Sequence, residues 1–227
     1  GNLPEEELIE IIAEEFADIE KRNLGKIETQ DINSLQQEPA FTEIVRKECV
    51  DESLQQARLI MVWRVPGLVQ LSQTYALDVL SAILGHGRTS RLWRDLREER
   101  ELVNYISVSN MTNQLQGTFL IAAHCEVENL AEVEEAIVQH IRKIQTEIEE
   151  LEITRVRKRV ANRFIFANER PSDRANLYGY YQTLVGDLEP AFDFPYHIQV
   201  QDTDTLIEAA KTYLSPDAYG VVVMRPN

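Results

Sequence analysis

The order in which strand-like and helix-like segments follow one another constrains the fold of this chain more than any other feature. Apolar, β-branched runs that predict strands lie mostly in the first half, and helical repeats fill most of the second half. A last β-branched run, residues 219–224, predicts a strand that returns to the sheet. This order favours an α+β two-layer sandwich, a largely antiparallel sheet with helices packed on one face, over an alternating parallel fold.

The predicted elements follow from hydrophobic periodicity and from turn residues. The clearest strand signal is the period-two alternation of residues 117–127, which places every second side chain on one face. The apolar members of that face are Phe119, Ile121, Ala123, Cys125 and Val127. Further strands are predicted over residues 41–50, 57–65 and 102–111. Helices are predicted over residues 71–85, 89–100, 133–148, 153–168, 171–186 and 204–213.

The first forty residues are organised differently from the rest. Leu8, Ile12 and Phe16 repeat at helical spacing among many acidic residues, which predicts a helix with a solvated outer face. The helical spacing of apolar residues then ends, and polar residues follow around Gly25, which is typical of a linker. We therefore divide the chain into a helix over residues 1–24, a linker over 25–39 and a main domain over 40–227.

Composition excludes several classes of partner. The formal net charge is −15, so the chain would repel a phosphate backbone and no nucleic-acid partner is expected. No run approaches the roughly 18 uninterrupted apolar residues of a membrane span. With 44% hydrophobic and 27% charged residues the chain reads as a soluble globular protein, and the cytoplasm and the periplasm are both compatible with it.

The sequence contains no catalytic constellation. Its four histidines, His86, His124, His140 and His197, are too far apart to pair on one helical turn, and neither H-E-x-x-H nor its inverted form H-x-x-E-H occurs. We expect no metal site and no cofactor in this chain, which on its own should be inactive. His140 lies on the apolar stripe of its helix, where a hydrogen-bonded histidine at the edge of the core is expected.

Five arginines recur every three residues in an otherwise acidic chain. They are Arg88, Arg91, Arg94, Arg97 and Arg100. One interpretation pairs most of them with the neighbouring acids of the same stretch, Asp95, Glu98, Glu99 and Glu101. The other interpretation is that one guanidinium holds a peptide, because its planar fork binds a carbonyl or carboxylate in fixed geometry.

The same stretch carries a resemblance to a known family. Residues 84–105, LGHGRTSRLWRDLREERELVNY, closely resemble the glycine turn, "SRL" helix and "LREKRGLAY" segment of the pitrilysin or insulinase-type zinc metallopeptidases, which include the mitochondrial processing peptidases. Residues 57–67, 151–168, 174–186 and 202–226 are similar to other segments of that family, in the same order. The resemblance covers residues 41–227, and residues 1–23 resemble the last helix of a preceding homologous half.

The resemblance implies a role for a chain that has no catalytic site of its own. Such enzymes consist of paired homologous halves, of which one holds zinc and the other lacks metal and encloses the peptide substrate. This chain resembles the C-terminal, zinc-free half, so zinc is expected in a homologous partner half or subunit, and the enzyme would be a zinc metalloendopeptidase. The alternative is a purely structural assembly subunit of the same fold, a kind of protein that the family also includes.

The resemblance also implies residues that contact substrate. The family grips its substrate with an arginine and a tyrosine, and Arg97 matches the arginine. Aligned through Arg100 and Leu102, the tyrosine position falls on Asn104, with Tyr105 one residue late. Because successive strand side chains point to opposite faces, the shift leaves three alternatives: a bulge re-aims Tyr105, Asn104 replaces it, or the grip is lost.

Overall fold

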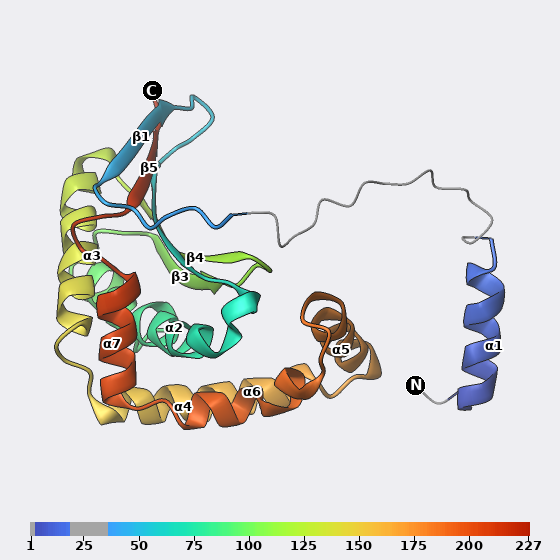
Figure 1. The fold of residues 1–227 in the computed structure, drawn as a ribbon. Helices are drawn as coiled ribbons and strands as arrows, with labels where there is room; N and C mark the ends of the chain where they lie inside the picture. Colours follow the sequence, from blue (N-terminus) through green and yellow to red (C-terminus); the bar gives the residue numbers. More distant parts are fainter. Residues whose placement is uncertain (1–2, 19–35) are drawn as a thin grey trace.

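A five-stranded sheet forms one layer of the protein (Figure 1). The computed structural model describes residues 3–18 and 36–227. The strands of this sheet, whose spatial order is β1-β5-β2-β4-β3, are β1 (Val45–Val50), β2 (Ala57–Pro66), β3 (Tyr105–Met111), β4 (Gln116–Cys125) and β5 (Gly220–Arg225). All neighbouring strands are antiparallel except β1 and β5. The predicted α+β class with a largely antiparallel sheet is confirmed.

Helices form the second layer. Among the described residues the α-helices are α1 (Glu5–Phe16), α2 (Leu71–Gly85), α3 (Leu130–Ile144), α4 (Glu150–Ala167), α5 (Pro171–Leu184), α6 (Glu189–Gln199) and α7 (Thr203–Tyr213). α1 buries no residue and is not part of this layer. Figure 1 shows α2, α3 and α7 against one side of the sheet, with α4 and α6 packed on α2. The opposite face of the sheet carries no helix of the described chain, and we call it the open face.

The core lies between the sheet and α2, α3 and α7, and period-two alternation produces it. In β2, Leu59, Met61 and Trp63 face the helices and are almost fully buried. In β4, the predicted face is buried from Phe119 to Cys125. Val127, assigned to the same face, is instead 41% exposed, because the strand ends at Cys125 and a short 3-10 turn follows.

α2 is the central helix of the fold. It is apolar on nearly every side, and most of its residues are buried, as expected for a helix with protein all round it. Its end approaches the sheet closely at Gly85, where a Cβ atom would lie 2.3 Å from Cγ2 and 2.8 Å from the backbone nitrogen of Val108. Asp78 is the one charged residue of the whole helix.

Some predicted boundaries were wrong for identifiable reasons. Residues 41–44 and 102–104, predicted as strand, lie outside β1 and β3. The sequence analysis missed α6, which contains Pro190 at its start and Pro195 inside it, a residue that ordinarily interrupts a helix. Here Pro190 suits the first turn, and the buried Ala191 and Ile198 anchor the helix on the core.

The predicted N-terminal helix is present as α1, whose described residues are all exposed. Most of the predicted linker, residues 25–35, lies outside the described residues. Residues 36–39 form no regular structure, and Gln37 donates a hydrogen bond to the Leu115 carbonyl at 2.8 Å. No helix within the described ranges is both long enough and apolar enough to cross a bilayer.

The contact at Gly85 gives a prediction on stability. Gly85→Ala should lower the free energy of unfolding by about 1–3 kcal/mol, because the new methyl group overlaps Val108 and its backbone. The control is Gly179→Ala in α5, where nothing lies within 4 Å of the added carbon and a gain of about 0.5–1 kcal/mol is expected. Urea unfolding of both variants measures the difference; equal midpoints would contradict the close packing of α2 on β3.

Candidate functional site

The connection from α2 to β3 is a compact turn and helix that presents the arginine stretch. Gly87 has a φ of +85°, a conformation that favours glycine, and its carbonyl accepts hydrogen bonds from the Ser90 backbone and hydroxyl. The predicted helix over residues 89–100 is present, but its core, Trp93–Glu99, is wound as a π-helix. π-helical turns occur frequently at functional sites, and this one contains Arg94 and Arg97.

The five arginines have different surroundings. Arg88 is exposed, and Arg94 forms an exposed ion pair with Glu99 at 3.5 Å. Arg100 contacts Glu132 at 2.5 Å and Asp95 at 3.8 Å. The predicted pairing with neighbouring acids is therefore present for Arg94–Glu99 and Arg100–Asp95, but the closest partner of Arg100 comes from a distant helix.

Arg91 has a structural role. Its side chain is only 8% exposed, and its guanidinium donates to both carboxylate oxygens of Glu152, at 2.8 and 2.6 Å. The same group donates to the Glu147 carbonyl at 2.9 Å. Burial acts to raise the pKa of Glu152, but the Arg91 contacts and the Glu149 backbone N–H hold it below its ordinary value. The ion pair thus joins the arginine stretch to the beginning of α4.

Arg97 differs from the other arginines of the helix. Its guanidinium carbon lies 4.2 Å from the centre of the Trp93 ring, a cation–π contact. No hydrogen bond or ion pair joins it to any residue within the described ranges. Glu98, its sequence neighbour, accepts a hydrogen bond from the Trp93 indole at 2.8 Å instead. Arg97 is therefore oriented by a ring while its N–H donors stay available.

Tyr105 and Asn104 lie at the point where the chain enters β3. Tyr105 is the first residue of the strand, 43% exposed, and its ring lies on the open face, 4.9 Å from the ring of His124. Asn104 precedes the strand, is exposed, and its backbone N–H donates to the His124 carbonyl at 2.9 Å. The side chains of Asn104 and Tyr105, both suggested by the sequence, are thus accessible to solvent at the start of β3.

The strand itself contains no bulge. Residues from Tyr105 to Met111 pair with β4 in unbroken register. The preceding turn is the irregular part: Glu101 has a φ of 51°, and the Leu96 carbonyl accepts from the backbone N–H groups of both Leu102 and Val103. The turn, rather than a bulge in β3, therefore sets which face Tyr105 occupies.

A polar hollow of about 610 Å³ adjoins this region on the open face. His124 and Arg58 line it together with polar residues of the β1–β2 connection, including Gln55 and Gln56. Burial, and then the nearby Arg58 guanidinium, lowers the pKa of His124, so the imidazole is neutral at pH 7. The sequence analysis missed His124 and Arg58 because only the strand register places His124 beside Tyr105 and Arg58 beside His124.

The other histidines are held by separate contacts. The His140 Nε2–H donates a hydrogen bond to the Asp95 carboxylate at 2.8 Å, and the side chain is largely buried, as its place on the helix predicted. His86 contacts the Val108 carbonyl at 3.2 Å, and His197 stacks on Tyr75. Across the described part of the chain, no three His, Cys, Asp or Glu side chains come together in a group that could hold a metal ion.

The five-stranded sheet with helices on one face is a fold that this chain shares with a solved peptidase M16 inactive domain. The chain belongs to the peptidase M16 inactive domain family, whose model matches residues 1–160. This confirms the resemblance to the pitrilysin and insulinase-type metallopeptidases. The match agrees with the zinc-free C-terminal half that the sequence suggested.

Individual relatives agree with this assignment. The zinc protease PqqE of Helicobacter pylori is 24% identical over 228 residues, which are 100% of this chain and 50% of that protein. The fold is similar to that of a protease from Helicobacter pylori, with a TM-score of 0.83 and 22% identity over 100% of this chain and 54% of that one. It is also similar to a peptidase M16 inactive domain from Pseudomonas fluorescens, with a TM-score of 0.70 and 18% identity over 85% and 45%. The chain spans about half the length of these relatives.

The buried ion pair of Arg91 and the exposed ion pair of Arg94 give a matched prediction. Arg91→Ala should lower the free energy of unfolding by about 3 kcal/mol or more, because it leaves the Glu152 carboxylate partly buried without its counter-charge. Arg94→Ala removes an exposed pair and should change stability by less than about 1 kcal/mol. Chemical denaturation of both variants tests this. Comparable losses of unfolding free energy would show that Arg91 stabilises the fold no more than Arg94 does.

Proposed function

We propose that this chain is the substrate-enclosing, non-catalytic half of a zinc metallopeptidase that processes or degrades peptides. In this proposal the chain forms one side of the chamber that encloses the peptide. It excludes water from that chamber and orients the scissile peptide bond for a zinc-bearing half. The family supports the first part, since this is its inactive domain, and the similarity to a zinc protease about twice as long supports the second.

The observation that carries the proposal is the state of Arg97. A guanidinium fixed on an aromatic ring, with no acceptor among the described residues, has its donors free for a carbonyl or carboxylate. Tyr105 lies at the entry to the next strand, on the open face beside His124. We assign Arg97 and Tyr105 to the peptide grip, with Asn104 as a second polar contact at the same entry.

The zinc belongs to the other half in this proposal. The described part of this chain offers no group of three suitable ligands, so its own residues do not fit the metal. When bound in the partner half, zinc would polarise the scissile carbonyl. The contribution of this chain is limited to holding the peptide and shielding it from solvent.

We also propose that α1 belongs structurally to that other half. Its apolar stripe is exposed: Leu8, Ile12 and Phe16 are 44%, 49% and 59% exposed. A stripe of this kind ordinarily packs against another element. In this proposal residues 1–24 end the preceding half, residues 25–39 connect the halves, and residues 40–227 form the zinc-free domain.

The grip is tested in the assembled enzyme. When this chain is combined with its zinc-bearing half, Arg97→Ala should lower kcat/KM for a peptide substrate by about 10- to 150-fold, the expected effect of losing a charge-assisted hydrogen bond. Tyr105→Phe, which keeps the ring on His124, isolates the contribution of the hydroxyl group. Steady-state cleavage of a fluorogenic peptide measures each effect.

Arg94→Ala is the matched control, because Arg94 lies on the same helix and its ion pair is exposed. Equal activity of Arg97→Ala and Arg94→Ala would remove Arg97 from the grip. If the combined halves assemble but cleave no peptide, the structural-subunit alternative replaces the peptidase role.

The placement of α1 gives a separate prediction. Leu8→Asp combined with Ile12→Asp should weaken the association of this chain with a separately expressed zinc-bearing half by at least about tenfold, because two charges enter an apolar contact. The melting temperature of this chain alone should not change. Glu10→Lys serves as the surface control. Unchanged association, measured by analytical ultracentrifugation, would exclude α1 from the interface.

A further inference from the structure

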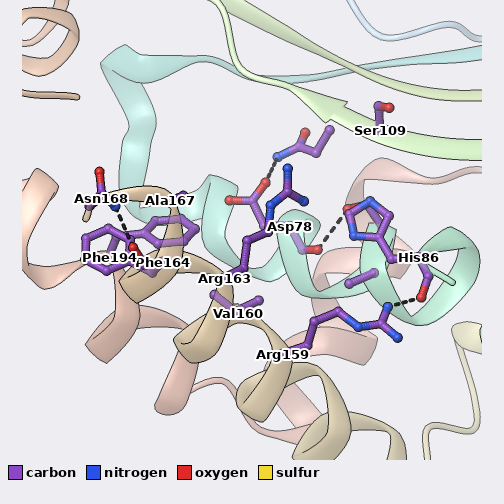
Figure 2. Close-up of a pocket in the computed structure, with 13 residues that line it drawn as sticks. Asp78, His86, Ser109, Arg159, Val160, Arg163, Phe164, Ala167, Asn168 and Phe194 are labelled. Carbon is purple, nitrogen blue, oxygen red and sulfur yellow. Dashed lines mark hydrogen bonds between the residues drawn. The ribbon is translucent and has the colours of Figure 1, made fainter. Parts of the chain in front are cut away.

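A cavity of about 430 Å³ lies away from the proposed grip, between α2, β3, α4 and α6 (Figure 2). Neither Arg97, Asn104 nor Tyr105 is among the residues that line it. Its size is that of pockets that take small ligands. Its lining combines one carboxylate, two guanidinium groups and an apolar wall, which together define the chemistry of an occupant.

Asp78 forms the acidic part of the cavity. Its carboxylate accepts a hydrogen bond from the Asn110 side-chain amide at 2.8 Å, and no ion pair neutralises it within the described chain. The amide oxygen of Asn110 is buried and accepts no hydrogen bond from the described residues. Asp78 is therefore a charged acceptor in the cavity lining that has no cationic partner among the described residues.

The carboxylate of Asp78 is unfavourable for stability. Burial raises its pKa from 3.8 to about 6, and the Asn110 hydrogen bond only partly offsets this. A charged group on an otherwise apolar helix has no benefit for packing, and groups of this kind cluster at binding sites. A lone Asp within an apolar helix is also visible in the sequence, although the sequence analysis did not weigh it.

Arg159 and Arg163 form the basic part. They project from successive turns of α4, and Figure 2 shows both side chains directed from that helix into the cavity. Arg159 donates a hydrogen bond to the His86 carbonyl. Arg163 has no hydrogen bond or ion pair with any described residue, so its fork is available for an anion.

An apolar wall completes the cavity. Phe164 of α4 and Phe194 of α6 stack with ring centres 6.1 Å apart, and Val160 and Ala167 continue this surface. Aromatic and aliphatic side chains of this kind enclose an apolar group of a ligand, while the polar groups fix its orientation.

From this arrangement we infer that the cavity binds a short zwitterionic peptide with an apolar side chain. The ligand's ammonium group lies on Asp78, its carboxylate on Arg163, and its apolar side chain against Phe164 and Phe194. The inference does not rest on the proposed grip, since it requires neither zinc nor a second half. Hydrolysis of peptide bonds is the class of reaction that produces such ligands.

The position of Asp78 gives a stability prediction. Because its pKa is raised on folding, the wild type loses stability as pH increases from 3.8 through about 6. Asp78→Asn keeps an acceptor for Asn110 but not the charge, so its melting temperature should exceed that of the wild type by roughly 2–6 °C at pH 7.5. The difference should disappear as pH falls towards 4.

Other titrating groups are common to the two proteins, so their effects cancel in this comparison. Those in the cavity or interacting with its neighbours are Tyr75, His86, Arg159, Arg163, Tyr180, Tyr181 and Asp193. A melting temperature of Asp78→Asn below that of the wild type at pH 7.5 would show that the carboxylate stabilises the fold, which removes the argument for its role in binding.

The binding experiment uses this chain and the dipeptide Leu-Phe, titrated by calorimetry at pH 7.5. N-acetyl-Leu-Phe lacks the ammonium group and Leu-Phe-amide lacks the carboxylate, so each should bind at least about tenfold more weakly. Asp78→Asn should abolish the preference over the acetylated ligand and keep the preference over the amide. Arg163→Gln should show the reverse pattern.

Arg174→Gln, an exposed arginine outside the cavity, is the control for net charge and should behave as the wild type. Absence of binding at millimolar Leu-Phe overturns the inference. Equal binding of the three dipeptide ligands, or the same response from Asp78→Asn and Arg163→Gln, overturns it as well.

Discussion

The burial of α2 is the constraint on which the rest of the structure depends. A helix that is apolar on nearly all sides must be covered on nearly all sides, so the sheet covers one side and α4, α6 and α7 cover the others. The close approach at Gly85 fixes the distance between this helix and β3. Arg91 then ties the following turn to the beginning of α4 through Glu152. The buried α2 helix, its close packing at Gly85 and the Arg91–Glu152 ion pair together position the arginine stretch and the wall of the cavity.

The sequence predicts the layers well because each depends on a local period. The alternation in β4 and the apolar stripe that includes Ile137 and Ile141 in α3 are both buried in the structure as their spacing predicted. α6 was missed because Pro195 argues locally against a helix, and only packing against the core outweighs it. The pairing of Arg91 with Glu152 was equally out of reach, since 61 positions separate the partners.

The candidate site also has a part that the local sequence predicts and a part that depends on the tertiary structure. The Arg97 position follows from a local motif, and its cation–π contact with Trp93 spans one turn of the same segment. The surroundings of Tyr105 do not follow locally, because its contact with His124 requires the register of β3 against β4. Asp78 is intermediate: its unusual place in an apolar helix is visible in the sequence, but its partner Asn110 and the facing arginines belong to other elements.

The position of β5 in the sheet has a consequence for biosynthesis. β5 lies between β1 and β2, yet it follows β4 along the chain only after the five helices α3–α7. While a ribosome is producing those helices, β2 presents an unpaired edge of N–H and C=O groups, and β1 has no neighbour in the sheet. Such an edge is a template for another chain. The interval before β5 emerges is therefore the time when this edge of β2 is most open to intermolecular pairing.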